Sequence, residues 1–195
     1  RPPVVGVASR AGEEKRRQRR GNGASHQNTG AFGLAKSSGI DVGAESSVPI
    51  KAQADYRPSE MATTSFGQGI DVNMVQMIAA LNVIPNGGKY VQPHVVERVG
   101  GRPTALSQTA PRPVISAETA AEMNQMMKSV VQNGSGSMAR IPGFEKDEAG
   151  KTGTSQIPVA GQYTQDLWSR DVRYLPASPP RLPMRFLIRH PNNTP

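Results

Sequence analysis

The sequence predicts an α+β fold in which helices pack on a mostly antiparallel sheet. Two amphipathic segments with helix-capping residues lie in the middle of the chain, and two extended runs joined by a proline-rich turn lie near its C-terminal end. Capping residues around an apolar stripe at helical spacing indicate a helix, and paired extended runs indicate a β-hairpin. Helices followed by a hairpin are typical of an α+β layer.

The composition fits part of a larger globular unit or a domain with irregular ends. Of the 195 residues, 36% are hydrophobic and 5% aromatic, while glycine (20) and proline (17) are frequent. Residues 1–31 are basic, glycine-rich and without periodicity, so we expect them to be disordered or aberrant. We expect the ordered unit over residues 32–195.

The net charge of +8 suggests a polyanion partner such as nucleic acid, but its distribution weakens that interpretation. The cationic residues crowd the two ends of the chain, which favours solvated segments. No aromatic residue interleaves the run at 15–20, so a nucleic-acid-binding arm is kept only as an alternative. The crowded residues are Arg10, Lys15, Arg16, Arg17, Arg19 and Arg20 at one end and Arg170, Arg173, Arg181, Arg185 and Arg189 at the other.

The residue types that build disulfides and metal sites are absent or scattered. Cysteine is absent, and His26, His94 and His190 lack a ligand spacing such as H-x-x-x-H. We therefore expect no metal and no cofactor. No apolar run approaches the length that spans a bilayer.

Two helices are predicted from their caps and stripes. The first begins after Asn73, a favoured N-cap residue with Gln76 as its capping-box partner, and ends before Pro85. The second begins after Ser116 and ends at residues 133–134, an Asn-Gly pair that we expect to form a left-handed C-cap. The apolar stripes are Met74, Met77, Ile78 and Leu81 in the first helix and Ala120, Met123, Met127 and Val130 in the second.

Three extended segments are predicted. Residues 90–99 follow a Gly-Gly turn and are rich in β-branched residues, although Pro93 favours an edge position. Residues 168–175 and 182–188 flank a proline-rich turn and should pair as an antiparallel hairpin. One face of the last strand should be buried, because apolar residues occupy every second position, namely Leu182, Met184, Phe186 and Ile188.

The strongest chemical signal is a Lys-Thr-Gly triplet in the segment Ala149-Gly150-Lys151-Thr152-Gly153-Thr154-Ser155-Gln156. In a strand, Lys151 and Gly153 would point to one face and Thr152 and Thr154 to the other. Threonine hydroxyls and an ammonium can hold a carboxylate, and glycine allows a ligand to approach closely. On an edge strand, a main-chain N–H could also donate to an oxyanion. A bare triplet by itself favours an ordinary glycine-containing turn or strand entry, because short triplets often arise by chance.

The triplet closes a collinear series of segments. In chain order they are Ser38-Gly39-Ile40-Asp41-Val42 with Glu45, Ser65-Phe66-Gly67-Gln68-Gly69-Ile70, Asn86-Gly87-Gly88-Lys89-Tyr90-Val91-Gln92-Pro93, Ala139-Arg140-Ile141-Pro142-Gly143-Phe144 and the triplet segment. This series resembles the penicillin-binding transpeptidases, most closely the class B enzymes. The first segment is similar to the "TGIDL" turn of that family, with Ser38 in place of threonine and Val42 in place of leucine.

The resemblance implies a penicillin-binding transpeptidase/β-lactamase-like fold and serine acyl transfer on the D-Ala-D-Ala end of peptidoglycan stem peptides. In that family a serine forms an acyl-enzyme, which an amine of a second stem peptide resolves, and β-lactams acylate the same serine. By similarity, Lys151, Thr152, Gly153 and Thr154 belong to the catalytic site. Thr152, Thr154 and Ser155 would bind the substrate, and the N–H of Thr154 would form half of the oxyanion hole.

Two of the three motifs of that family do not occur in this chain: no serine has lysine three positions later, and no Ser-x-Asn occurs. Both motifs lie upstream of Phe32 in the family. We therefore interpret the chain as the C-terminal part of a transpeptidase domain and expect it to be inactive by itself. A non-catalytic paralogue and the nucleic-acid-binding chain are the alternatives. For the parent protein, the resemblance implies an N-terminal membrane anchor, an extracytoplasmic location and divisome or elongasome partners.

One stretch departs from the family pattern. Where the family has an apolar strand, residues 168–173 include Arg170 and Arg173. Burying an unpaired arginine in a central strand would be costly. Arg185 and Arg189 are less troubling, because they fall on the face opposite the apolar stripe.

Overall fold

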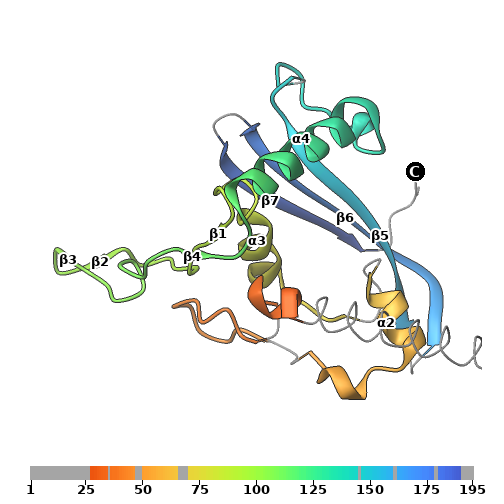
Figure 1. The fold of residues 1–195 in the computed structure, drawn as a ribbon, viewed down its shortest axis with the longest axis horizontal. Coiled ribbons are helices and arrows are strands. Elements are labelled where there is room, and N and C mark those ends of the chain that lie inside the picture. The colour runs from red at the N-terminus through yellow and green to blue at the C-terminus, as the bar shows by residue number, and fades with distance from the viewer. Residues whose placement is uncertain are drawn as a thin grey trace, which may run out of the picture.

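The computed structural model describes residues 27–34, 36–46, 50–65, 70–144, 146–159, 162–177 and 180–189. A three-stranded antiparallel sheet with helices packed on it forms the centre of this part of the chain, which confirms the predicted α+β class (Figure 1). The basic run at 10–20 and the segment at 66–69 lie outside the described residues. Residues 27–31 form a helical turn, in which the N–H of Phe32 donates to the Asn28 carbonyl, so the described structure begins before Phe32.

The main sheet has the strand order β5-β6-β7. β5 spans Ala149–Val159, β6 spans Gln162–Ala177 and β7 spans Pro180–Arg189. Both strand pairs are antiparallel, which confirms the predicted hairpin of β6 and β7. β5, which carries the Lys-Thr-Gly triplet, is therefore an edge strand of the described sheet.

Both predicted helices form where their N-caps indicated. α3 spans Met74–Asn82, and Asn73 and Gln76 form the complete capping box. α4 spans Ala117–Asn133, and the hydroxyl of Ser116 accepts a hydrogen bond from the N–H of Thr119. Each cap satisfies a main-chain donor that has no partner inside its helix.

The end and the buried stripe of α4 differ from the prediction. Gly134 has φ −115° and ψ −157°, which is extended backbone, so the predicted left-handed C-cap is wrong. Ala120, Met127 and Val131 are buried, whereas Met123 is exposed. The buried stripe includes Val131 because the end of α4 packs along β5, close to Gly150.

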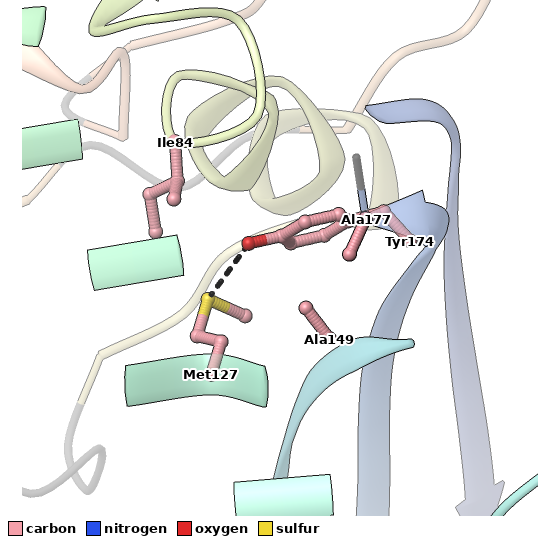
Figure 2. Packing of buried hydrophobic residues seen from close by; sticks show 5 residues of the cluster. All are labelled: Ile84, Met127, Ala149, Tyr174 and Ala177. Carbon is pink, nitrogen blue, oxygen red and sulfur yellow. Dashed lines mark hydrogen bonds between the residues drawn. The ribbon is translucent and has the colours of Figure 1, made fainter. Parts of the chain in front are cut away.

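The core lies between the helices and one face of the main sheet (Figure 2). The Tyr174 hydroxyl donates to Asn124 on α4 at 2.9 Å and contacts the Met127 sulfur at 3.7 Å. Burial raises the pKa of Tyr174 to about 12. α3 and α4 pack on the same face of the sheet, because Ile84, which follows α3, and Met127 of α4 belong to one buried cluster. The cluster consists of Ile84, Met127, Ala149, Tyr174 and Ala177.

The remaining described elements are short. η1 spans Gln53–Asp55, α2 Pro58–Ser65 and η2 Ser137–Ala139; β1 (Lys89–Tyr90) pairs with β4 (Arg112–Pro113), and β2 (Arg98–Val99) with β3 (Arg102–Pro103). The predicted strand over 90–99 is wrong, because only its two ends are strand. Between them, the N–H groups of Val95 and Val96 donate to the Asp41 carboxylate at 2.7 and 2.9 Å instead of to a neighbouring strand.

The apolar stripe of β7 is not buried, contrary to the prediction. Leu182, Phe186 and Ile188 are 55%, 50% and 56% exposed, and Met184 is half-buried. The register pairs Pro183 with Tyr174, which faces the helices, so the stripe lies on the opposite face of the sheet. The prediction fails because a period of two identifies an apolar face but not what covers it. The described helices α3 and α4 pack on the other face.

Arg185 lies opposite the stripe, as predicted, but this face is the one that the helices cover, so the expectation that Arg185 would be less troubling is wrong. Its guanidinium donates to the main-chain oxygen of Asn73 at 3.3 Å. Burial lowers the pKa of Arg185, and the charge of Arg170 lowers it further. At Arg170, burial lowers the pKa, and the charge of Asp71 opposes this effect. The side chain of Arg189 lies outside the described part.

Candidate functional site

The predicted site residues lie in one extended strand at the edge of the sheet. Ala149 lies in the helix-covered core. Lys151 and Gly153, at every second position from it, therefore lie on that face, and Thr152 and Thr154 lie on the opposite face. The tetrad lies in a strand, which is the condition on which the predicted alternation depends.

The two glycines of this segment differ in their surroundings. A side chain at Gly150 would meet the carbonyl oxygen of Val172 at 2.7 Å and Arg173 at 2.9 Å. At Gly153, no atom of the described residues lies within 4 Å of the position that a Cβ would occupy. The packing of β5 on β6 therefore requires Gly150, whereas the described residues leave room for a side chain at Gly153. The space beside Gly153 is open to a ligand.

The side chains of Ser135 and Lys151 each form a hydrogen bond at Thr152. Ser135, which follows α4, places its Oγ 2.9 Å from Thr152 Oγ1. The Lys151 ammonium donates to the main-chain oxygen of Thr152. Thr152 therefore has the Ser135 hydroxyl beside its side chain and the Lys151 ammonium beside its main-chain oxygen.

A buried ion pair fixes β6 to the segment that precedes the triplet. The Arg173 guanidinium donates to the carboxylates of Glu148 and Asp171, and to the main-chain oxygen of Gly136 at 3.2 Å. Glu148 and Arg173 are 0% and 3% exposed, and Glu148 also accepts the N–H of Ile141 at 3.0 Å. Desolvation alone would lower the pKa of Arg173, but the hydrogen bonds and charges of Asp171 and Glu148 outweigh it and raise the pKa. The cost expected for an unpaired arginine in β6 therefore does not arise at this position.

Glu45 holds the turn that resembles the "TGIDL" segment. It accepts hydrogen bonds from the Ser37 hydroxyl, from the N–H groups of Ser38 and Gly39 at 2.9 and 3.2 Å, and from the Asn73 side chain at 2.8 Å. Desolvation raises the pKa of Glu45, but these bonds outweigh it and lower the pKa to about 2. Because Asn73 caps α3, Glu45 ties the turn to the start of that helix.

Comparison with known families shows to which family the chain belongs. Residues 12–194 match the family model of the penicillin binding protein transpeptidase domain. The chain belongs to this family. Stage V sporulation protein D of Bacillus subtilis is 31% identical over 169 residues, which cover 84% of this chain and 26% of that protein. Penicillin-binding protein PbpB of Mycobacterium tuberculosis is 30% identical over 202 residues, which cover 96% of this chain and 29% of that protein.

Solved structures of the family share the fold. Penicillin-binding protein 3 of M. tuberculosis in complex with aztreonam matches with a TM-score of 0.75 and 27% identity, over 86% of this chain and 40% of that chain. A putative peptidoglycan glycosyltransferase from Atopobium parvulum matches with a TM-score of 0.71 and 28% identity, over 83% of this chain and 38% of that chain. The predicted fold, part of a penicillin-binding transpeptidase domain, is confirmed. The chain spans less than a third of the length of the two curated relatives.

Sequence reasoning missed several residues that shape this region. Ser135 gave no signal, because its contact with Thr152 joins residues 17 positions apart. Glu148 directly precedes the Ala-Gly-Lys segment, and this place beside the triplet could have marked it as a residue of the site region. Its partner Arg173 could be identified only once the register placed it opposite Gly150.

In the part of the chain that the structure describes, no group of three or more His, Asp or Glu side chains is arranged to hold a metal ion. Over the same residues, the helices lack the combination of length and hydropathy that crossing a bilayer requires.

Proposed function

We propose that this chain supplies the Lys-Thr-Gly strand of a serine D,D-transpeptidase that cross-links peptidoglycan. The observation that carries the proposal is the open space at Gly153, on an edge strand that also presents the hydroxyls of Thr152 and Thr154. A glycine needed only for packing would be in tight contact, as Gly150 is. On an edge strand, a glycine in open space allows a ligand to approach the backbone closely.

Each residue of the tetrad has a role in the proposed mechanism. The hydroxyls of Thr152 and Thr154 bind the carboxylate of the D-Ala-D-Ala donor, and Lys151 adds positive charge. The N–H of Thr154 donates to the oxyanion of the tetrahedral intermediate. In an antiparallel strand, this N–H points to the same side as the Thr152 carbonyl, and the Lys151 ammonium reaches that carbonyl. Ser155, the next residue of β5, also binds the substrate.

We place the nucleophilic serine, its lysine and the Ser-x-Asn motif in sequence upstream of this chain in the same polypeptide. No serine of the chain has lysine three positions later. The chain also covers only 26% and 29% of its two curated relatives. The exposed apolar stripe of β7 supports the proposal, because an apolar sheet face is normally covered by other elements of a domain. The chain by itself is expected to form no acyl-enzyme.

The ligands and the location follow from the same proposal. The solved relatives include penicillin-binding protein 3 of M. tuberculosis complexed with aztreonam and with ampicillin. We extend β-lactam binding to the polypeptide that contains this chain, with stem peptides as its natural substrates. We also propose the extracytoplasmic face of the membrane as its location, and divisome or elongasome proteins as its partners.

Labelling with a fluorescent penicillin tests the proposal. Sequencing the coding DNA upstream of Arg1 defines the longer polypeptide, in which we expect a Ser-x-x-Lys motif. This polypeptide should form a covalent band that survives boiling, and alanine at the motif serine should abolish the band. The 195-residue chain alone should not be labelled.

Two results would contradict the proposal. Labelling of the chain alone would show that the nucleophile lies within it. An upstream sequence without Ser-x-x-Lys, or a longer polypeptide that is folded but not labelled, would favour the non-catalytic paralogue.

A further inference from the structure

We propose that Ser135 is a positioning residue that orients the carboxylate-binding hydroxyl of Thr152. The inference rests on the proposed function and adds to the site a residue from outside the triplet strand. Ser135 lies between α4 and η2, and its Oγ is 2.9 Å from Thr152 Oγ1. Ser135 is exposed and Thr152 is half-buried, so a ligand can reach the pair.

The two hydroxyls together determine where the proton of Thr152 points. A hydroxyl donates one hydrogen bond and can accept others. Either hydroxyl can be the donor of the bond between Ser135 and Thr152. When Thr152 donates its proton to a bound carboxylate, its oxygen remains free to accept from Ser135, and the relay then runs from Ser135 to Thr152 to the carboxylate. Hydrogen bonds linked in this way polarise and strengthen one another.

The buried ion pair holds the Ser135 loop in place. Gly136, the next residue, accepts a hydrogen bond from Arg173 at 3.2 Å, and the N–H of Ile141 donates to Glu148 at 3.0 Å. The loop is thus attached to the same two buried side chains at both ends. This attachment fixes the distance between Ser135 and β5.

Arg173 also offsets part of the negative charge beside the site. Thr152 lies directly opposite Asp171 in the register of β5 and β6. Cross-strand partners share a face, so an unpaired Asp171 carboxylate would repel an anionic donor at Thr152. Arg173 binds Asp171 and weakens this repulsion, although it shares its positive charge with Glu148. Arg173 therefore supports the Thr152 hydroxyl both by position and by charge.

The test uses the longer polypeptide that contains this chain and its nucleophile, with three variants. Ser135→Ala removes the donor, Ser135→Thr keeps a hydroxyl, and Ser137→Ala is the matched control in the same loop, where the hydrogen bonds of Ser137 are made by its main chain. Ser135→Ala should weaken the non-covalent binding of penicillin about 10-fold, as expected for the loss of a hydrogen bond worth about 1.4 kcal/mol. The maximal acylation rate should change less, because the nucleophile is untouched.

NMR couplings of Thr152 provide the readout that a purely structural role would not change. In Ser135→Ala, Thr152 should populate more than one χ1 rotamer, while Ser135→Thr should restore both the single rotamer and the binding. Ser137→Ala should behave as the wild type. Two results would overturn this inference and leave the proposed function standing. One is wild-type penicillin binding in Ser135→Ala, and the other is weakened binding that is not recovered in Ser135→Thr. A wild-type polypeptide that is not acylated would overturn both.

Discussion

At the scale of single residues, Gly150 and Gly153 look alike in the sequence but have different surroundings in the structure. A side chain at Gly150 would collide with β6, whereas a side chain at Gly153 would enter open space. The first glycine serves the fold, and we assign the second to ligand access. Periodicity cannot separate these two roles, because both depend on which atoms lie across the strand.

A paired substitution tests this assignment. Gly150→Ala should destabilise the protein by about 1–3 kcal/mol, the usual range for overpacking. Gly153→Ala should keep the wild-type Tm and slow acylation by penicillin in the longer polypeptide, because its methyl group would occupy the space meant for the ligand. Thermal unfolding and acylation kinetics measure the two effects. A normal acylation rate in Gly153→Ala would contradict the assignment.

The second residue-scale prediction concerns the buried pair of Glu148 and Arg173. Glu148→Ala leaves a buried guanidinium with Asp171 as its remaining carboxylate, and removing one partner of a buried pair typically costs about 3–5 kcal/mol. Replacing both residues, as Glu148→Leu with Arg173→Met, should recover part of this loss, because Asp171 then loses its ion pair with Arg173. Urea unfolding of Glu148→Leu, Arg173→Met and the double variant measures the coupling energy.

Lys51→Ala provides the control for that cycle. Lys51 forms an exposed ion pair with Glu60 at 2.9 Å. Its loss should change the free energy of unfolding little, because solvent screens an exposed pair. A Glu148→Ala effect no larger than that of Lys51→Ala would refute the importance of the buried pair.

At the scale of elements, the sequence predicted those features that depend on neighbouring residues. The capping box of α3 and the hairpin of β6 and β7 are local, and both formed as expected. The strand over 90–99 failed because Asp41, far away in the chain, takes the main-chain donors of Val95 and Val96. The C-cap at Gly134 failed because the loop that follows is held against β5 by Arg173. Long-range contacts of this kind leave no periodic signal.

The turn held by Glu45 gives an element-scale prediction on pH. The pKa of Glu45 falls from 4.5 to about 2 in the folded protein. A lowered pKa stabilises the fold above the unfolded value, so this contribution is fully present above about pH 5 and is lost as the pH falls toward 2. Glu45→Gln should therefore flatten the decline in stability between pH 5 and 2, as measured by urea midpoints.

Ser37→Ala is the matched variant for the Glu45 prediction. It removes one of the hydrogen bonds to Glu45 and leaves the carboxylate in place. Its pH profile should lie between those of the wild type and Glu45→Gln. An acid profile that is unchanged in Glu45→Gln would show that the contacts of Glu45 do not stabilise the turn.

At the scale of the whole molecule, the exposed stripe of Leu182, Phe186 and Ile188 marks a sheet face that the described helices do not cover. If upstream sequence covers this face, Phe186→Ser should destabilise the longer polypeptide by about 3 kcal/mol, as for other losses of a large buried side chain. In the chain alone the same substitution should change stability little and lower the binding of a hydrophobic dye. Equal effects in both polypeptides would contradict the proposal that the chain is part of a larger domain.

We propose that β5 binds the anionic group of an acyl donor through the hydroxyls of Thr152 and Thr154. A crystal structure of the longer polypeptide acylated by a penicillin would locate this group. We expect the penicillin carboxylate at about 2.7 Å from both hydroxyls, with the acyl oxygen accepting a hydrogen bond from the N–H of Thr154. An acylated protein with its carboxylate bound elsewhere, or with β5 turned away from the ligand, would contradict it.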